Sequence, residues 1–262
     1  MSLLDLVLIA LVRGVAEVLP VDPGGHVLLI SKLAGWRPGS IVAAIDFGAA
    51  MALSCYLWRF LSSIGISVWR LRKGRVEPGA RLLGKALLTA APVIVAQSFF
   101  GAPETASLNL MLVVGVIALV TAVVMLFADQ LCMTVKRVEH MGPGGALALG
   151  LSQLLAFVPG VGRLGAAVIM GRLLGLERPS AFRFILLASI PVLLAAFGQE
   201  VAANAAQGVG PTLADVLAAV STFVLTLPAV ALTTRWLERS GLLPFVLYRL
   251  VIGGVLVALA LV

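Results

Sequence analysis

Two short stretches rich in proline and glycine contain most of the residues in this chain whose side chains could do chemistry. The first reads EVLPVDPGGH and runs from Glu17 to His26. Glu17 could act as a base or a metal ligand, and Asp22 could act as a nucleophile or cap a helix. His26 could donate a hydrogen bond to a phosphate or move a proton. Gly24 and Gly25 would let an anion approach backbone N–H groups closely.

The second stretch reads PGVGR and ends at Arg163. The guanidinium group of Arg163 carries a permanent charge and a planar set of donors that suits phosphate. Gly160 and Gly162 again leave the backbone accessible to a ligand. Arg13 lies four residues before Glu17, where it either adds a cation to the site or pairs with that acid along a helix. These residue types predict an anion-binding site, with phosphate as the anion.

The composition predicts that these residues are positioned by helices in a membrane. The chain of 262 residues is 61% hydrophobic and 12% charged, with a mean hydropathy of +1.10, whereas soluble domains carry about 25% charged residues. We therefore expect an all-α integral membrane protein, with residues 1–262 forming one membrane domain. Because a spanning helix needs about 20 apolar residues, six spans are predicted, at 41–61, 86–101, 108–132, 185–203, 213–233 and 242–262.

Two further apolar regions, 3–35 and 146–176, are interrupted by the two stretches described above. Each half is too short to cross a membrane, so each region is predicted to form a re-entrant pair of helices. Irregular backbone at membrane depth is tolerated only where it is buried in protein or lines a wet cavity. The two breaks are therefore expected inside the protein, near the middle of the bilayer.

The two interrupted regions also resemble each other at an offset of about 140 residues. Pro20 corresponds to Pro159, the segment KLAG ending at Gly35 corresponds to RLLG ending at Gly175, and Arg37-Pro38 corresponds to Arg178-Pro179. This pattern predicts a duplication, with repeats at approximately 1–132 and 133–262. The spans between the two interrupted regions place them on opposite faces of the membrane, so the repeats have inverted topology. Broken helices in inverted repeats indicate a binding site near the bilayer midplane.

The charge distribution orients the predicted helices. The net charge is +7 and the isoelectric point is about 10.3, and the segments 70–85 and 133–140 are both basic. Basic loops face the cytoplasm, so both segments should lie on that face and the C-terminus on the other. The placement of basic residues in cytoplasmic segments explains the positive net charge, so no nucleic-acid partner is needed to explain it. Binding to anionic lipid headgroups stays open as an added role of these segments.

The sequences GVAEVLPVDPGGH and SQLLAFVPGVGRLGAAVIMGRLLGL resemble the two signature motifs of the undecaprenyl-diphosphate phosphatase family, also called bacitracin-resistance proteins. The segments YLWRF, RFILLASIP and LPFVLYRLVIGG are also similar to segments of that family. The resemblance implies six spanning helices, two re-entrant pairs and a polyprenyl diphosphate ligand whose site opens to the periplasm. It also implies a multi-pass protein of the bacterial inner membrane.

The first motif departs from the family pattern, which reads Glu-x-x-x-Glu followed by Leu-Pro-Val-Ser-Ser-Thr-Gly-His. Arg13 stands at the first acid, and Glu17 keeps the second. Asp22 and Pro23 stand at the two serines, the second of which is the nucleophile in that pattern, and Gly24 stands at the threonine. The resemblance therefore does not supply a nucleophile, and the loss of an acid at Arg13 could remove a place for a divalent cation.

The second motif has lost its hydroxyl groups as well. The family pattern reads Pro-Gly-x-Ser-Arg-Ser-Gly-x-Thr, and its two serines and its threonine fall on Gly162, Leu164 and Ala167. Arg163 and Gly165 remain. The residues that remain suit anion recognition better than the usual phosphoryl transfer.

Three functions follow from these residues. The main prediction is a non-hydrolytic relative that binds a polyprenyl phosphate or another anionic lipid and moves it across the bilayer. The alternative is a lipid diphosphate phosphatase with altered chemistry, in which Asp22 forms an aspartyl-phosphate, or Glu17 or His26 activates water. The third is a regulatory partner of an envelope-assembly enzyme. No cofactor is required by any of them, a divalent cation stays open for hydrolysis, and the oligomeric state, a homodimer included, is left undecided.

Overall fold

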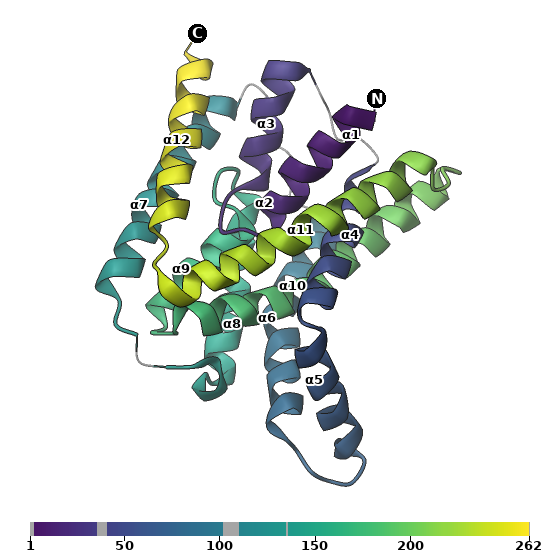
Figure 1. Ribbon diagram of the computed structural model, residues 1–262, viewed down its shortest axis with the longest axis vertical. Coiled ribbons are helices and arrows are strands. Elements are labelled where there is room, and N and C mark those ends of the chain that lie inside the picture. The colour runs from purple at the N-terminus through teal and green to yellow at the C-terminus, as the bar shows by residue number, and fades with distance from the viewer. Residues whose placement is uncertain (1–2, 36–40, 102–109, 135, 262) are drawn as a thin grey trace.

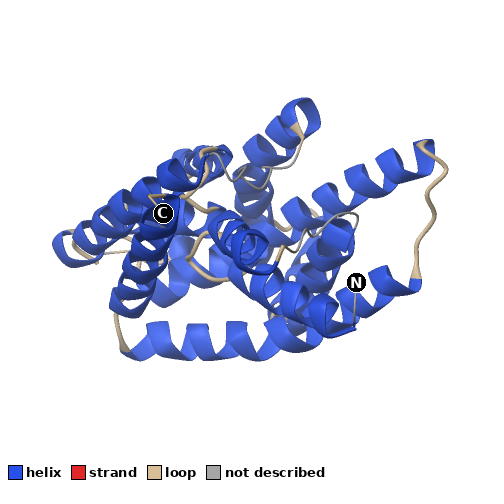
Figure 2. Ribbon diagram, turned by 90° about the horizontal axis from the view of Figure 1, so that it is seen from above, coloured by secondary structure: helices blue, strands red, loops and turns tan. Residues whose placement is uncertain are grey.

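The computed structural model describes residues 3–35, 41–101, 110–134 and 136–261, and this part of the chain is helical and contains no β-strand (Figures 1 and 2). The predicted correspondence of Arg37-Pro38 falls outside the described residues. The helices are α1 (Leu3–Ile9), the π-helical η1 (Ala10–Gly14), α2 (Val15–Glu17), α3 (Pro23–Ala34), α4 (Val42–Tyr56), α5 (Trp58–Leu71), α6 (Pro78–Phe100), α7 (Met111–Leu131), η4 (Val138–His140), α8 (Pro143–Gln153), η5 (Leu154–Phe157), α9 (Arg163–Leu173), α10 (Arg178–Ala206), α11 (Leu213–Arg239) and α12 (Leu243–Ala260).

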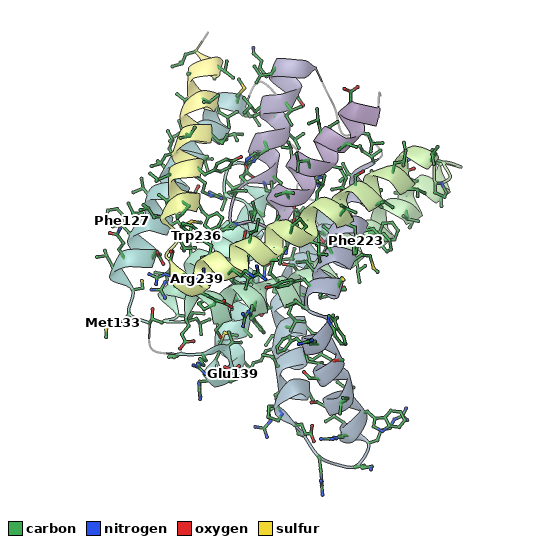
Figure 3. The ribbon with its side chains drawn as sticks, in the orientation of Figure 1. Phe127, Met133, Glu139, Phe223, Trp236 and Arg239 are labelled. Carbon is green, nitrogen blue, oxygen red and sulfur yellow. The ribbon has the colours of Figure 1, made fainter. Side chains whose placement is uncertain are left out.

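Within the described residues, five of the six predicted regions contain a helix of spanning length. Within the described residues, α6, α7, α10, α11 and α12 are each long and apolar enough to cross a membrane, and α4 with α5 would make a sixth span with a bend of 77°. Large apolar side chains such as Phe127 and Trp236, which are 56% and 47% exposed, lie on the outer surface (Figure 3). In water such a surface would be unfavourable, and it confirms the prediction of an all-α integral membrane protein.

The predicted span at 41–61 is instead two helices that meet at Leu57, and the predicted starts of two other spans were wrong. Helix α6 begins at Pro78 instead of residue 86, and α10 begins at Arg178 instead of residue 185. In both helices a proline stands at the first or second position, where its missing N–H group costs no hydrogen bond. Charged residues such as Arg81 and Lys85 are accommodated in the first turns of α6, so the basic segment 70–85 is mostly helical.

The two basic segments lie at the same end of the molecule, as predicted. The Nζ atom of Lys85, on α6, donates to the backbone carbonyl of Glu139 at 3.0 Å. Figure 1 shows the turn between α5 and α6 at the opposite end of the molecule from the C-terminal end of α12. Which compartment each end faces stays a prediction.

Each interrupted region forms a pair of helices around a break at residues 18–22 or 158–162. The first pair, α1 to α3, lies at the end where α12 finishes, and the second pair, α8 and α9, reaches the same centre from the other side (Figure 1). Helices α3 and α9 are followed by Gly35 and Gly175, which have left-handed φ values of 68° and 74°. Only glycine adopts this conformation readily. The duplication itself stays a prediction.

A buried charge network fixes the start of α12, which carries side chains of the site. Asp129 at the end of α7 accepts a hydrogen bond of 2.9 Å from the backbone N–H of Leu242. The same carboxylate pairs with Arg178 at 2.5 Å and with Arg172 at 3.3 Å. Since a buried carboxylate is costly unless it is paired and hydrogen-bonded, this network ties α7, α9 and α10 to the beginning of α12.

Candidate functional site

The two breaks touch each other at the centre of the molecule. Gly162 has a φ of +73°, and a Cβ atom at this position would collide with the backbone carbonyl of Val21 and lie 3.0 Å from the Cα atom of Asp22. Glycine is therefore needed at residue 162 for two reasons, its backbone conformation and the close approach of the first break. We call the region where the two breaks meet the junction. Its residues come from 17–26, 160–163 and, as shown below, α12.

Arg163 and Glu17 join the two pairs of helices. The Nη2 and Nε atoms of Arg163 donate to Oε1 of Glu17 at 2.9 and 3.3 Å. Its Nη1 atom donates to Gln153 at 3.2 Å and to the hydroxyl of Ser189 at 2.8 Å. The guanidinium group is buried, and its charge is balanced by Glu17. The structure thus brings together two of the predicted site residues, but it uses most of the donors of Arg163 internally.

Arg249 on α12 is a second buried arginine at the junction, and only backbone carbonyls hold it. Its Nε atom donates to the carbonyl of Pro20 at 3.1 Å, and Nη1 reaches that of Gly160 at 3.5 Å. Nη2 donates to the carbonyl of Val161. Arg249 therefore bridges both breaks. Among the described residues no carboxylate makes an ion pair with it; the acid that shares its hollow is Asp22, whose carboxylate is held by backbone N–H groups.

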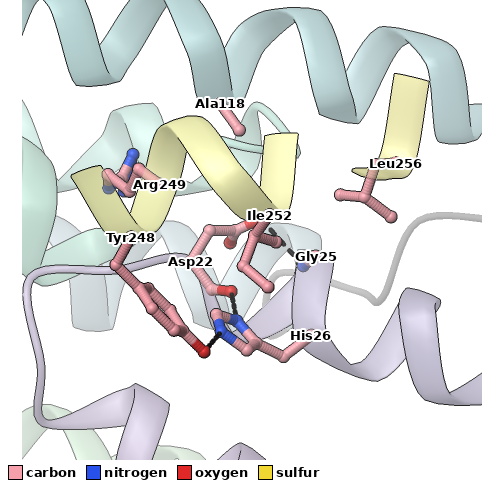
Figure 4. Close-up of a pocket in the computed structure, with 8 residues that line it drawn as sticks. All are labelled: Asp22, Gly25, His26, Ala118, Tyr248, Arg249, Ile252 and Leu256. Atoms are coloured by element: carbon pink, nitrogen blue, oxygen red, sulfur yellow. Dashed lines mark hydrogen bonds between the residues drawn. The ribbon is translucent and has the colours of Figure 1, made fainter. Parts of the chain in front are cut away.

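His26 lies between the first break and α12. Its Nδ1 atom is 2.5 Å from the carbonyl oxygen of Asp22, and Nε2 is 2.7 Å from the hydroxyl of Tyr248 (Figure 4). The two rings are stacked with centroids 5.4 Å apart. Because a carbonyl oxygen only accepts hydrogen bonds, Nδ1 carries the proton of the neutral ring. Nε2 is then the acceptor and faces the O–H group of Tyr248.

Asp22 caps α3. Its Oδ1 and Oδ2 atoms accept hydrogen bonds from the N–H groups of Gly24 at 3.2 Å and Gly25 at 2.8 Å. Asp22 begins the helix with Pro23 at its first position, an arrangement that stabilises a helix N-terminus. In this conformation the side chain of Asp22 itself occupies the backbone donors that were predicted to bind the anion.

Arg13 pairs with Asp46 of α4 instead of Glu17. The distance from its Nη2 atom to Oδ1 of Asp46 is 3.7 Å, and both side chains are almost buried. The nearby hydroxyl of Thr222 is buried as well and makes no hydrogen bond within the described chain. The pairing of Arg13 with Glu17 along one helix, which the sequence offered as an alternative, does not form. Glu17 is bound to Arg163 instead, and Arg13 contacts Asp46 on another helix.

A small, partly open hollow of about 10 Å³ lies beside the junction, with room for roughly one water molecule. One end is polar and contains Asp22, His26, Tyr248 and Arg249, and the other end is apolar and ends at Leu256 (Figure 4). The side chains around it suit a charged head and a hydrocarbon chain, and the hollow would have to widen to admit such a ligand.

Neither a metal centre nor the family's usual hydroxyl groups can be assigned here. In the described chain no group of three or more histidine, cysteine, aspartate or glutamate side chains gathers to hold a metal ion. Glu17 and Asp46 are each taken by an arginine, so we derive no step through a divalent cation. Ser189 is close to Arg163, but it donates to the carbonyl of Ile185 within α10. The hydroxyl group that contacts His26 is that of Tyr248.

The sequence did not predict the roles of Gln153, Ser189, Tyr248 and Arg249. Tyr248 and Arg249 were noted only within the segment LPFVLYRLVIGG. One signal in the sequence could have identified Arg249: it is a charged residue inside the predicted span 242–262, and ionisable residues in a membrane usually have a function.

Comparison with known proteins gives consistent matches over nearly the whole chain. The family model described as bacitracin resistance protein BacA matches residues 6–255. A protein of Rhodospirillum rubrum named undecaprenyl-diphosphatase 1 is 39% identical, over 99% of this chain and 96% of its own length. Proteins named undecaprenyl-diphosphatase from Jannaschia sp. and Ruegeria sp. strain TM1040 are each 34% identical, over 99% of both chains.

Proposed function

The chain belongs to the bacitracin resistance protein BacA family, and from this premise we propose that it hydrolyses a polyprenyl diphosphate, such as undecaprenyl diphosphate, to the monophosphate and phosphate. This reverses the order of the two leading predictions, since the non-hydrolytic carrier came first there. The relatives named undecaprenyl-diphosphatase support hydrolysis. The bacterial inner membrane is the compartment in which we propose that it acts.

The observation that carries the proposal is the buried charge of Arg249 beside His26. Arg249 holds both breaks together through backbone carbonyls and makes no ion pair among the described residues. Asp22, the acid in the same hollow, is engaged by the N–H groups of Gly24 and Gly25. A buried cation without an ion-pair partner is unfavourable, and a diphosphate group bound beside Arg249 would supply one. We therefore assign phosphate binding first to Arg249, which was not predicted, and second to Arg163, which exchanges part of its contact with Glu17 for the ligand.

His26 is the proposed base. Its Nδ1–H group is held by the Asp22 carbonyl, which leaves Nε2 without a proton and facing the hydroxyl of Tyr248 beside the hollow. A neutral histidine in this position can take a proton from an attacking oxygen and return it to a leaving group. The backbone contact fixes the ring orientation that this exchange requires. The carboxylate of Asp22, predicted as a nucleophile, is bound by two N–H groups and would first have to leave them.

One observation favours the second candidate, a protein that binds or moves the lipid without hydrolysing it. The positions of the family's motif hydroxyls are occupied by Asp22, Pro23, Gly24, Gly162, Leu164 and Ala167. None of these side chains provides a hydroxyl nucleophile. In that case Arg249 and Arg163 would serve binding alone.

Phosphate release from undecaprenyl diphosphate by the purified chain in detergent separates the two candidates. We expect release with the wild-type chain and a strong decrease with Arg249→Met. Binding of the lipid without any release, in a preparation whose thermal unfolding is cooperative, would instead support the non-hydrolytic carrier. A related phosphatase with intact motif serines serves as the positive control.

A further inference from the structure

The histidine of the junction makes a hydrogen bond with one hydroxyl group, which comes from the other end of the sequence. Tyr248 is 222 residues from His26, and its hydroxyl lies 2.7 Å from Nε2. The tautomer argued above makes this oxygen the donor and Nε2 the acceptor. A nucleophile bonded to a base, which is itself oriented by a third group, is the usual arrangement for activating a weak nucleophile. Here the three groups are Tyr248, His26 and the carbonyl of Asp22.

On the premise that the chain hydrolyses a polyprenyl diphosphate, we propose that Tyr248 is the nucleophile that replaces the missing motif serine. Its side chain lines the hollow, and the residue is 45% exposed, so a lipid headgroup that widens the hollow would meet its hydroxyl group. Arg249 follows it in the sequence and lines the same hollow, where its charge would stabilise both the phenolate and the phosphate. Ile252 and Leu256 continue the lining on the next turns of α12, where the hydrocarbon chain would lie.

The proposed reaction has two balanced steps. In the first, the Tyr248 oxygen attacks the terminal phosphorus, its proton moves to Nε2 of His26, and a phosphotyrosine forms. The bond between the terminal phosphorus and the bridging oxygen breaks, and polyprenyl monophosphate leaves with the electron pair and takes the proton from Nε2. In the second, His26 removes a proton from a water molecule that attacks the same phosphorus. Phosphate leaves, and the proton returns to the oxygen of Tyr248.

The chain contains two tyrosines, Tyr56 and Tyr248, which makes the assignment testable with a matched control. Tyr56 lies at the end of α4, outside the junction. We expect Tyr248→Phe to lower phosphate release by about a hundredfold or more, in the range found for loss of an essential reacting group. Tyr56→Phe should keep the wild-type rate. Thermal unfolding of both variants shows whether the hydroxyl of Tyr248 was needed for folding.

Trapping the intermediate separates a nucleophile from a residue that only positions His26. Undecaprenyl diphosphate with radioactive terminal phosphate is added to the wild-type chain, the reaction is stopped by denaturation, and the labelled peptide is sequenced. Label on Tyr248 that survives hydroxylamine is the expected result. Label that hydroxylamine removes would place the phosphate on an acid such as Asp22 and overturn the assignment. Loss of rate in Tyr248→Phe without label on Tyr248 would also overturn it. If Tyr248→Phe keeps the wild-type rate, hydrolysis stands and the nucleophile assignment is wrong, whereas no release by the wild type overturns both.

Discussion

Arg163 on α9 donates to Glu17 on α2 at 2.9 Å, although 146 residues separate them in the chain. This ion pair crosses from one re-entrant pair of helices to the other at the point where both are broken. It is largely buried, with side-chain exposures of 7% and 14%. A pair in this position holds the two breaks together and limits how far they can separate when a ligand enters.

Removing both members of this pair should cost less stability than the sum of removing each alone. We expect Arg163→Ala to destabilise the fold by about 3–5 kcal/mol, because it leaves a buried carboxylate unpaired. Glu17→Ala combined with Arg163→Ala should cost less than the sum of the single changes. Thermal unfolding of the three variants in detergent measures this coupling. Additive effects would mean that the two side chains do not interact.

Arg249 should contribute more to phosphate affinity than Arg163. We expect Arg249→Met to weaken binding of undecaprenyl diphosphate by about tenfold to a hundredfold, which corresponds to the loss of one charge-assisted hydrogen bond. Arg163→Lys keeps its charge beside Glu17 and should weaken binding less. Equilibrium binding of the radiolabelled lipid, scored on folded protein, compares the two. The assignment to Arg249 fails if Arg249→Met binds as the wild type does while Arg163→Lys does not.

Restoring the motif serines should succeed at one position and fail at the other. Pro23 is the first residue of α3, a position that many residues tolerate, so Pro23→Ser should fold and add the family's nucleophile. Gly162→Ser should destabilise the chain, because its Cβ atom would collide with the Val21 carbonyl and its backbone would be strained at a φ of +73°. Thermal unfolding and phosphate release of each single variant test this. A stable Gly162→Ser variant would contradict the contact between the breaks.

The sequence predicted the two breaks well, because proline and glycine interrupt apolar runs that are otherwise helical. It could not predict which charges pair. The spacing of Arg13 and Glu17 suits a contact along one helix, but Glu17 is bound by Arg163, and Arg13 by Asp46. Arg249 was missed because its partners are backbone carbonyls, which leave no pattern in the sequence. The partners of the charged side chains at the junction depend on tertiary contacts, which the sequence does not show. The position of the junction in the chain depends on local proline and glycine patterns, which it does.

The orientation in the membrane can be tested with single cysteines in a chain whose Cys55 and Cys132 have been replaced by serine. We expect a cysteine at Gln207, in the turn after α10, to react with an impermeant thiol reagent in intact bacterial cells. A cysteine at Val76, in the turn between α5 and α6, should be protected until the cells are broken. Val76 is preferred to Gly74, whose left-handed backbone would be strained by a side chain. The reverse pattern would place the end of the molecule where α12 finishes on the cytoplasmic face.

The central claim is that the junction cleaves a lipid diphosphate with His26 as its base. The most direct measurement is the rate of phosphate release from undecaprenyl diphosphate by the purified wild-type chain and by His26→Gln, prepared identically and shown to unfold at similar temperatures. Glutamine keeps a hydrogen-bonding side chain of comparable reach but cannot accept and return the proton. We predict measurable release by the wild type and a decrease of about a hundredfold or more in His26→Gln. Equal rates in the two chains, or no release by either, would contradict the claim.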